Sequence, residues 1–153
     1  MPAYSYKERF IPMVLDASKH QTIRMRRKYS AKPGDTLYHY FGLRTKHCRK
    51  LGESICKKVF TILIKKDGSV IKYDTRLTDA EAKKALRGNL MGLVLNDKYK
   101  NYLAYDDGFR FEPTGSHLTN FDFMLRWWKQ THQLPFIGDL IYWDPETFIK
   151  HKK

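Results

Sequence analysis

The stretch VFTILIKKDGSVIKY, residues 59–73, carries the clearest structural signal in the chain. Val59 to Ile64 is a run of β-branched and apolar residues, which are enriched in strands. Asp67-Gly68 follows, and an Asp-Gly pair between two such runs is the strongest short-range signal for a β-hairpin. The stretch therefore predicts a strand that continues to Lys66, a tight turn and a second strand, Ser69–Tyr73.

Segments on both sides of this hairpin have the patterns of further strands and helices. Thr78 and Glu81 have the spacing of a capping box, which predicts a helix through Ala80–Leu86. Apolar residues at intervals of three and four after Thr119 predict another helix, because this spacing places them on one face. The remaining expected elements are strands at 9–11, 22–24, 36–43 and 136–143, helices at 13–18 and 99–106, and a polar, aperiodic flap at 44–55.

The order of these elements places the chain in the α+β class. Short helices separate strands that occur at both ends and in the middle of the chain, and a small β-barrel with helices outside it is compatible with that order. No repeat or linker divides the sequence, and 153 residues fit one hydrophobic core. We therefore predict a single domain over residues 1–153.

Charge is the first indication of function. The chain has 29 Lys and Arg against 16 Asp and Glu, a net charge of +13. Residues 1–58 hold 14 of these cations and 4 of these acids, a net of +10, whereas residues 59–153 have a net of +3. A field concentrated in one part of a chain favours a polyanion and speeds its capture. A generally basic surface is the alternative, and charge alone does not separate RNA from DNA or from an anionic membrane surface.

Other features disfavour several classes of protein. No stretch approaches the roughly 20 apolar residues of a membrane helix, and the N-terminus lacks the apolar core of a signal peptide. We therefore expect a cytoplasmic protein with no membrane partner. Cys48 and Cys56 are too few for a disulfide scaffold and are expected to be free thiols. With His47 they match no common zinc spacing, so we predict no metal site, and no cofactor is expected.

Three short motifs occur in order along the chain: KHQTIR at residues 19–24, PGDTL at 33–37, and AYDDGF at 104–109, which FDFM at 121–124 follows. Together they resemble the ASCH domain family, a branch of the PUA-like β-barrels with the signatures K-x-x-T-I-R, G-D-x-L and A-x-x-[ED]-G-F. The match extends over residues 10–143, and Ser18 stands where the family usually has Gly. The resemblance implies a small PUA-like β-barrel with flanking helices.

The resemblance also implies a cleft with the K-x-x-T-I-R segment on its floor. Some ASCH-like proteins are similar to amidohydrolases that remove the acetyl group from N4-acetylcytidine, and the matching catalytic positions are Lys19, Thr22 and Asp107. Other members are regarded as RNA-binding, and ribonuclease activity has been associated with the family. Whether this chain is an enzyme stays open. If it is, the resemblance implies a hydrolase, either a ribonuclease or a nucleoside amidohydrolase.

The residue types at these positions suit acyl chemistry. In a partly desolvated cleft near Arg24 the ammonium form of Lys19 is disfavoured, so Lys19 can act as a base on the Thr22 hydroxyl. Asp107 can orient the lysine or hold a water, although it stands where the enzymes use the longer Glu, and one methylene matters for catalytic geometry. Arg24 has planar donors suited to a phosphate or a carbonyl oxygen. The same site can also hold a nucleotide without reacting.

Two basic clusters favour a nucleic-acid partner. Backbone phosphates and one stacked base fit a loop of cations with a neighbouring tyrosine. A cleft bordered by both clusters would hold a strand longer than one nucleotide. The expected phosphate or nucleic-acid ligands are Arg24, Arg26, Arg27, Lys28 and Tyr29 in the first cluster, and Arg44, Lys46, Arg49 and Lys50 in the second.

Three hypotheses of function follow from these features. The first is binding of RNA or single-stranded nucleic acid, with or without ribonuclease activity, and the charge distribution ranks it first. The second is an amidohydrolase that acts on N4-acetylcytidine or a related acylated nucleoside. The third is a protein-interaction domain that binds no nucleic acid. The expected partner is therefore RNA, a nucleotide or a nucleoside.

Overall fold

The computed structural model describes residues 2–110 and 119–152, and the chain forms two compact units. The first unit comprises Met1–Thr22, Arg27–Val59 and Ile141–Lys153, and the second comprises Ile23–Arg26 and Phe60–Leu140. By sequence the first unit has 15 Lys and Arg against 6 Asp and Glu, a net of +9, and the second has 14 against 10, a net of +4. The predicted single domain stays a prediction.

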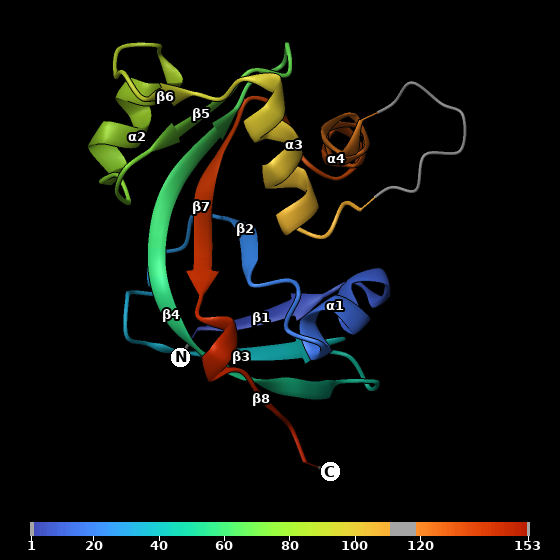
Figure 1. Cartoon of the computed structure of the whole chain (residues 1–153). Helices are drawn as coiled ribbons and strands as arrows, with labels where there is room; N and C mark the ends of the chain where they lie inside the picture. Colours follow the sequence, from blue (N-terminus) through green and yellow to red (C-terminus); the bar gives the residue numbers. More distant parts are fainter. Residues whose placement is uncertain (1, 111–118, 153) are drawn as a thin grey trace. The chain divides into compact units, whose positions relative to one another are not determined.

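The described strands form an eight-stranded sheet, and short helices complete a mixed architecture (Figure 1). The predicted α+β class is confirmed. The strand order runs β1-β3-β4-β5-β6, while β2 pairs with β7, and β7 and β8 both pair with β4. Because this path has two ends among the described strands, the β-barrel stays a prediction. The strands are β1 (Ala3–Tyr6), β2 (Gln21–Met25), β3 (Thr36–Phe41), β4 (Arg49–Ile64), β5 (Val70–Tyr73), β6 (Leu93–Val94), β7 (Phe136–Trp143) and β8 (Ile149–Lys150).

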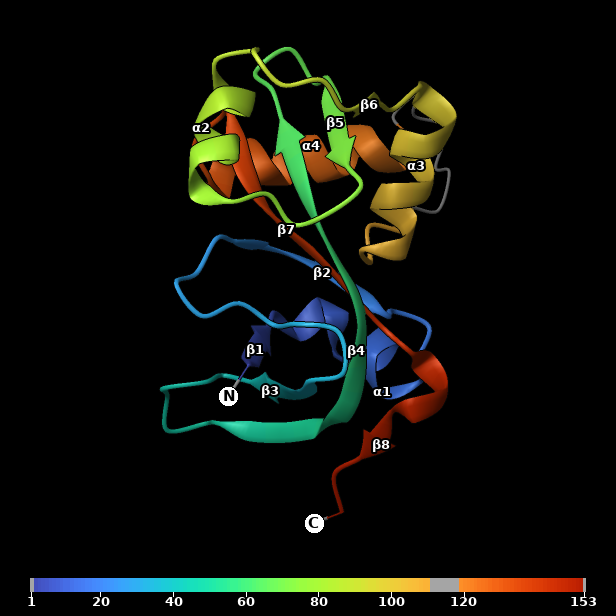
Figure 2. The same ribbon diagram turned by 90° about the vertical axis from the view of Figure 1, so that its left-hand side faces the viewer.

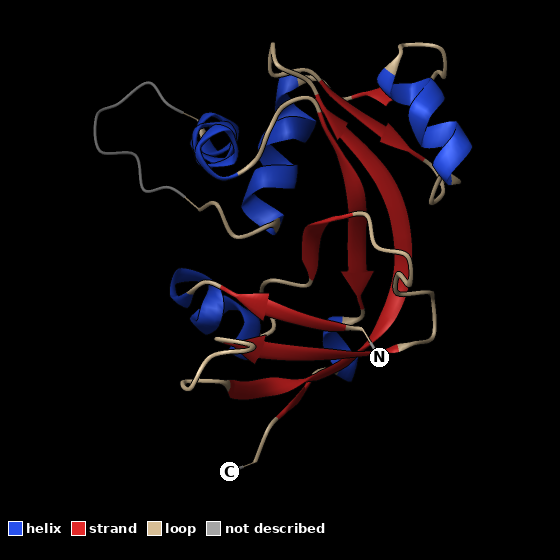
Figure 3. Ribbon diagram, turned by 180° about the vertical axis from the view of Figure 1, so that it is seen from behind, coloured by secondary structure: helices blue, strands red, loops and turns tan. Residues whose placement is uncertain are grey.

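Helices α2, α3 and α4 begin where the sequence supplies side-chain caps. The Thr78 hydroxyl accepts from the backbone N–H of Glu81, and the Glu81 carboxylate accepts from that of Thr78, which confirms the predicted capping box. Thr119 and Asp122 cap α4 in the same reciprocal way. Helices α3 and α4 pack against each other in the second unit (Figure 3). The helices are η1 (Glu8–Phe10), α1 (Ile11–Leu15), α2 (Asp79–Leu86), α3 (Asp97–Asp106), α4 (Asn120–Thr131) and η2 (Pro145–Thr147).

In the first unit, β1, β3 and the first part of β4 lie side by side (Figure 2). β1 pairs in parallel with β3, and β3 pairs antiparallel with β4. Successive side chains of a strand point to opposite faces. Accordingly Tyr4, Tyr6, Leu37 and His39 are buried, whereas the residues between them are partly exposed. The sheet therefore has one face toward the core and one that water reaches.

A chain of polar groups crosses the core of the first unit. The Tyr6 hydroxyl lies 2.9 Å from Nδ1 of His39, and Nε2 of the same ring lies 2.7 Å from the Ser54 hydroxyl. The Trp143 ring packs on His39 with a centroid separation of 4.6 Å. Buried polar atoms are costly unless they are hydrogen-bonded. Both ring nitrogens of His39 are satisfied in this arrangement, which explains how a histidine occupies a strand position in the core.

The hairpin predicted from residues 59–73 is confirmed in the second unit. β4 and β5 pair antiparallel, with Ile64 opposite Val70. In the turn, the Asp67 carboxylate accepts from the Ser69 N–H at 2.9 Å, and Gly68 has a φ of +88°, which glycine adopts without steric cost. The residues at the centre of this unit's core include Leu63, Tyr73, Leu77 and Ala85.

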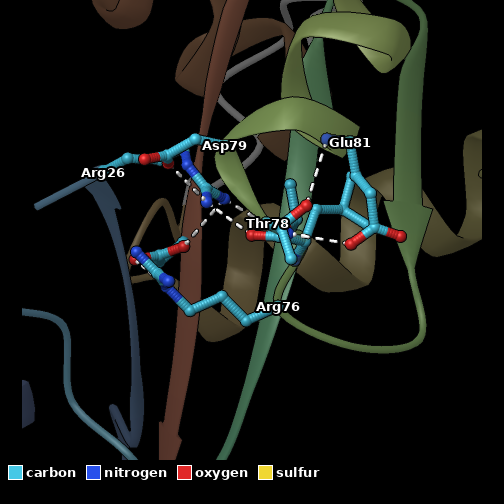
Figure 4. A network of polar contacts seen from close by, with 8 residues as sticks. Arg26, Arg76, Thr78, Asp79 and Glu81 are labelled. Carbon is cyan, nitrogen blue, oxygen red and sulfur yellow. Dashed lines mark hydrogen bonds and ion pairs between the residues drawn. The ribbon is translucent and has the colours of Figure 1, made fainter. Parts of the chain in front are cut away.

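Two arginines hold a buried carboxylate in the second unit. Asp139 on β7 is 2% exposed. Its oxygens lie 3.2 Å from Nε of Arg76 and 3.7 Å from the Arg26 guanidinium. Arg26 also lies 3.2 Å from the Asp79 carboxylate and donates to the carbonyl oxygen of Leu77 (Figure 4). Because a charge is tolerated in the interior when it is paired and hydrogen-bonded, this network ties β2, β7 and the start of α2 together.

Three of the expected elements were wrong in whole or in part, and one of them is the helix at 13–18, because α1 ends at Leu15. Residues 9–11 are not a strand: they form the end of η1 and the start of α1, whose first turn contains Pro12, a favoured position for proline. The expected flap at 44–55 ends early, because β4 begins at Arg49. The register between β3 and β4 shifts at Leu51 of β4, which lies between the partners of His39 and Tyr40 and has no residue opposite it. Leu51 and Gly52 are both buried, and this irregularity concealed the alternation of a strand.

Candidate anion-binding cleft

A tight turn presents the second basic cluster in the first unit. Residues 44–49 of the turn are all exposed. The Thr45 hydroxyl donates to the Gly42 carbonyl at 2.6 Å and accepts from the His47 N–H at 3.2 Å. Gly42 has a φ of +64°, and a Cβ there would lie 2.8 Å from the Thr45 hydroxyl. Glycine at position 42 therefore lets the turn close on itself, with its basic side chains in water.

Strand β8 brings the C-terminal segment beside this turn. It pairs antiparallel with β4 through Gly52 and Lys150. A Cβ on residue 52 would lie 2.5 Å from the carbonyl oxygen of Ile149, which is closer than real contacts allow. A glycine inside a strand often marks such a close approach of another backbone. Gly52 is therefore the residue that allows β8 to pair, and this pairing places Lys150 next to the basic turn.

The turn, β8 and the end of α1 enclose a cleft of about 640 Å³. Of the nine described residues that line it, none is acidic, and Arg44 is not one of the nine. A concave site lined by charges of one sign concentrates counter-ions from solution. The cleft therefore favours an anionic ligand. Its lining is Leu15, Lys46, His47, Cys48, Arg49, Lys50, Leu51, Lys150 and His151.

Lys50 is the most constrained cation of this lining. Its ammonium lies 2.7 Å from the Glu53 carboxylate, and this hydrogen bond raises the pKa of Lys50 above its ordinary value. The ammonium also lies 5.3 Å from the centre of the Tyr38 ring, a cation–π distance. These contacts keep Lys50 charged and hold its side chain in place at the edge of the cleft.

Lys19 and Thr22 of the K-x-x-T-I-R segment lie in the first unit and are buried. Lys19 is 2% exposed, and its amine donates to the carbonyl oxygen of Gln21 at 2.7 Å. The same amine lies 5.3 Å from the centre of the Phe10 ring and 5.8 Å from that of Tyr6. The lysine thus contacts a backbone carbonyl and lies near two aromatic rings, and a catalytic role for Lys19 and Thr22 stays a prediction.

Arg24 and Asp107 belong to the second unit, and the roles predicted for them stay predictions. Asp107 is buried at the end of α3, where its N–H donates to the carbonyl oxygen of Leu103 at 3.0 Å. Arg24 is partly exposed and lies near His132. Burial, and then the charge of Arg24, lower the pKa of His132 below its ordinary value.

The residues of the first basic cluster contact different parts of the chain. Arg26 is engaged by Asp79 and Asp139, so we leave it out of the proposed phosphate ligands. Arg27 donates to a β1 carbonyl, and its guanidinium lies 4.7 Å from the Tyr4 ring. Lys28 lies 5.5 Å from the centre of the exposed Tyr29 ring. None of these residues is among the described residues that line this cleft, and a groove bordered by both clusters stays a prediction.

Comparison with known proteins gave no assignment. No family model matches the chain, and no curated protein or solved structure is significantly similar to it. Neither the ASCH resemblance nor a function is tested by that result, and both stay predictions.

Other features of the described residues bear on the expected chemistry. Cys48 is exposed, Cys56 is buried, and both are free thiols, as the sequence predicted. Desolvation raises the pKa of Cys56 to about 11, which keeps this thiol protonated. Within residues 2–110 and 119–152 no group of three or more His, Cys, Asp or Glu is placed to hold a metal ion. No described helix is both long and apolar enough to cross a membrane.

The sequence predicted part of the cleft and missed the rest. Lys46, Arg49 and Lys50 were expected as phosphate ligands, and the structure places all three in the lining. Lys150 and His151 were not expected. Their only signal is the basic C-terminal stretch IKHKK, residues 149–153, because a two-residue strand has too little pattern to predict.

Proposed function

We propose that this protein binds single-stranded RNA and that the basic cleft of the first unit holds the phosphates. The observation that carries the proposal is a concave lining with four cations and no acid. Lysine and arginine side chains bind phosphate oxygens, and arginine does so with two parallel hydrogen bonds. The proposal includes the ASCH-type, PUA-like fold that the three sequence motifs predict.

Charge outside the cleft supports the same partner. The unit that contains the cleft has a net charge of +9. A field of this sign attracts a polyanion from a distance and raises its association rate. A lone mononucleotide would use only one or two of the cations, whereas a strand can place successive phosphates along Lys46, Arg49 and Lys150. The distribution of charge therefore favours a strand over a mononucleotide.

Replacement of Lys46 and Lys150 by Ala should weaken binding of a single-stranded RNA oligonucleotide by about 5- to 30-fold, since each exposed ion pair is worth up to about 1 kcal/mol. The matched control is the double replacement of Lys57 and Lys58, which removes the same charge from exposed positions of the same unit outside the cleft. Fluorescence anisotropy at fixed salt measures both. An equal loss in the two variants would mean that binding follows net charge and would rule out the cleft.

The amidohydrolase is the second candidate, and the burial of Lys19 favours it. Burial disfavours the charged form of a lysine and so favours its action as a base, and Lys19 is 2% exposed. Thr22, the proposed nucleophile, is buried three residues along the chain. In the reaction the Thr22 oxygen bonds to the acetyl carbon as the C–N bond breaks, and the leaving amine takes up the proton of the hydroxyl through Lys19. Water then hydrolyses the acetyl ester, which releases acetate and restores the Thr22 hydroxyl.

Incubation with N4-acetylcytidine tests this candidate by release of cytidine, measured by chromatography. Thr22→Val removes the hydroxyl with little change in volume and should abolish the reaction, whereas Thr22→Ser keeps the hydroxyl and should retain activity. Full turnover by the Val variant would contradict a threonine nucleophile. No turnover by the wild-type chain would remove N4-acetylcytidine as a substrate.

A further inference from the structure

Two tyrosines of β3 share the face of the sheet that water reaches. Tyr38 and Tyr40 are two residues apart, so their side chains leave the same face of the strand. Both are partly exposed, whereas Leu37 and His39, on the opposite face, are buried. The core of the first unit therefore does not need these two rings for its packing.

One residue, Lys50, belongs both to this face of the sheet and to the lining of the basic cleft. In the register of β3 and β4, Tyr40 lies opposite Lys50 and Tyr38 lies opposite Glu53. The Lys50 ammonium lies 5.3 Å from the centre of the Tyr38 ring. Lys50 also lines the cleft. The tyrosines and the candidate phosphate ligands are therefore neighbours within one unit.

We propose that Tyr38 and Tyr40 form a stacking surface for two bases of the strand whose phosphates the cleft holds. This inference rests on the proposed function and adds that the bases of the strand, as well as its phosphates, contact the protein. Aromatic side chains beside a basic groove bind single strands without sequence preference, because every base has a π-face. In the register of β1 and β3, the small residues Ala3 and Ser5 lie opposite Tyr38 and Tyr40.

The spacing of the rings selects an unpaired strand. Residues two apart on a strand are separated by about 7 Å. Bases in a duplex are about 3.4 Å apart and already stacked on one another, so neither can lie on a protein ring without leaving its partner. Bases of a flexible single strand can separate and lie on Tyr38 and Tyr40 in turn. The surface therefore favours single strands over duplexes.

Glu53 weakens the binding of a negatively charged strand at this site. Its carboxylate is the acid that faces Lys50, and it partly offsets the attraction of Lys50 for a phosphate. A ligand that approaches the tyrosines meets this carboxylate beside Tyr38. Glu53→Gln should accordingly tighten binding of the strand, because it removes a negative charge and keeps the shape of the side chain.

The experiment compares an RNA oligonucleotide with an abasic strand of the same length and charge, both offered to the full chain. The abasic strand keeps the phosphates and lacks the bases. We expect the base-bearing strand to bind about 5- to 150-fold more tightly for each base that stacks. Equal affinity for the two strands overturns the stacking surface and leaves phosphate binding in place. If neither strand binds, the proposed function itself fails.

Variants of Tyr38 and Tyr40 test whether these two rings are the ones on which the bases stack. The double replacement of Tyr38 and Tyr40 by Ser should reduce the ratio between the two affinities to near one, and the double replacement by Phe, which keeps the rings, should restore it. A thermal melt of each variant reports whether it is folded. The comparison of the two strands on the wild-type chain needs no variant, so the proposal stays testable if the Ser variant unfolds. An unchanged ratio in a folded Ser variant would contradict the assignment of these two tyrosines.

Discussion

Replacement of Asp139 by Ala should lower the free energy of unfolding by about 3–5 kcal/mol, the largest effect that we expect from one substitution. The carboxylate is 2% exposed and faces the guanidinium groups of Arg26 and Arg76. Its removal leaves Arg26, whose side chain is only 13% exposed, with less negative charge in a site that water barely reaches. The loss of stability comes mainly from a charge that is left partly uncompensated in the interior, and it exceeds the energy of a single contact.

Asp79→Ala is the matched control for this prediction. Asp79 contacts the same guanidinium of Arg26 at 3.2 Å, but its side chain is 93% exposed. Exposed ion pairs contribute about 1 kcal/mol or less. Urea unfolding followed by tryptophan fluorescence gives both free energies from midpoints and slopes. If the two variants lose the same stability, burial does not govern this network and our description of it is wrong.

Gly52→Ala should destabilise the first unit by about 1–3 kcal/mol and weaken RNA binding as well. A Cβ at this position would lie 2.5 Å from the Ile149 carbonyl and 2.7 Å from the Phe148 ring, so β8 must shift. That shift would move Lys150 and His151, which line the cleft. Because the substitution changes no charge, any loss of affinity comes from geometry alone.

Gly34→Ala is the matched control for Gly52→Ala, because it should lower stability without changing the cleft. Gly34, also in the first unit, has a φ of +94°, and nothing lies within 4 Å of the position of a Cβ. Alanine there costs about 1–2 kcal/mol through backbone strain and disturbs no neighbour. We expect urea unfolding to show a similar loss in both variants, and anisotropy to show weaker RNA binding only for Gly52→Ala. Equal affinity of the two variants would contradict the role of β8 in the cleft.

Local signals in the sequence predicted the elements that depend on them. The Asp67-Gly68 turn, the capping box at Thr78 and the strand at 136–143 were all found where expected. The short strands β1, β6 and β8 have two to four residues, and their pairing depends on partners far along the chain. The strand at 9–11 was misread because apolar residues before Pro12 suit a helix start as well as a strand.

For the candidate site, the sequence predicted the charged residues of one segment but not the contacts with residues far along the chain. The charges at 46–50 were evident from composition, but the turn that presents them depends on Gly42 and Thr45. Lys150 reaches the cleft through pairing with Gly52, almost one hundred residues earlier, which no local pattern encodes. Arg26 looked like a phosphate ligand in the sequence, because the buried carboxylate that engages it lies more than one hundred residues away.

The salt dependence of RNA binding tests the central claim most directly. Four cations of the cleft, Lys46, Arg49, Lys50 and Lys150, can each neutralise one phosphate. For a single strand the logarithm of the association constant should then fall against the logarithm of salt concentration with a slope of about −3, and of about half that for the variant that lacks Lys46 and Lys150. That pair of slopes is the result we predict. Absent binding, or a slope near zero in the wild-type chain, would contradict a phosphate-binding cleft.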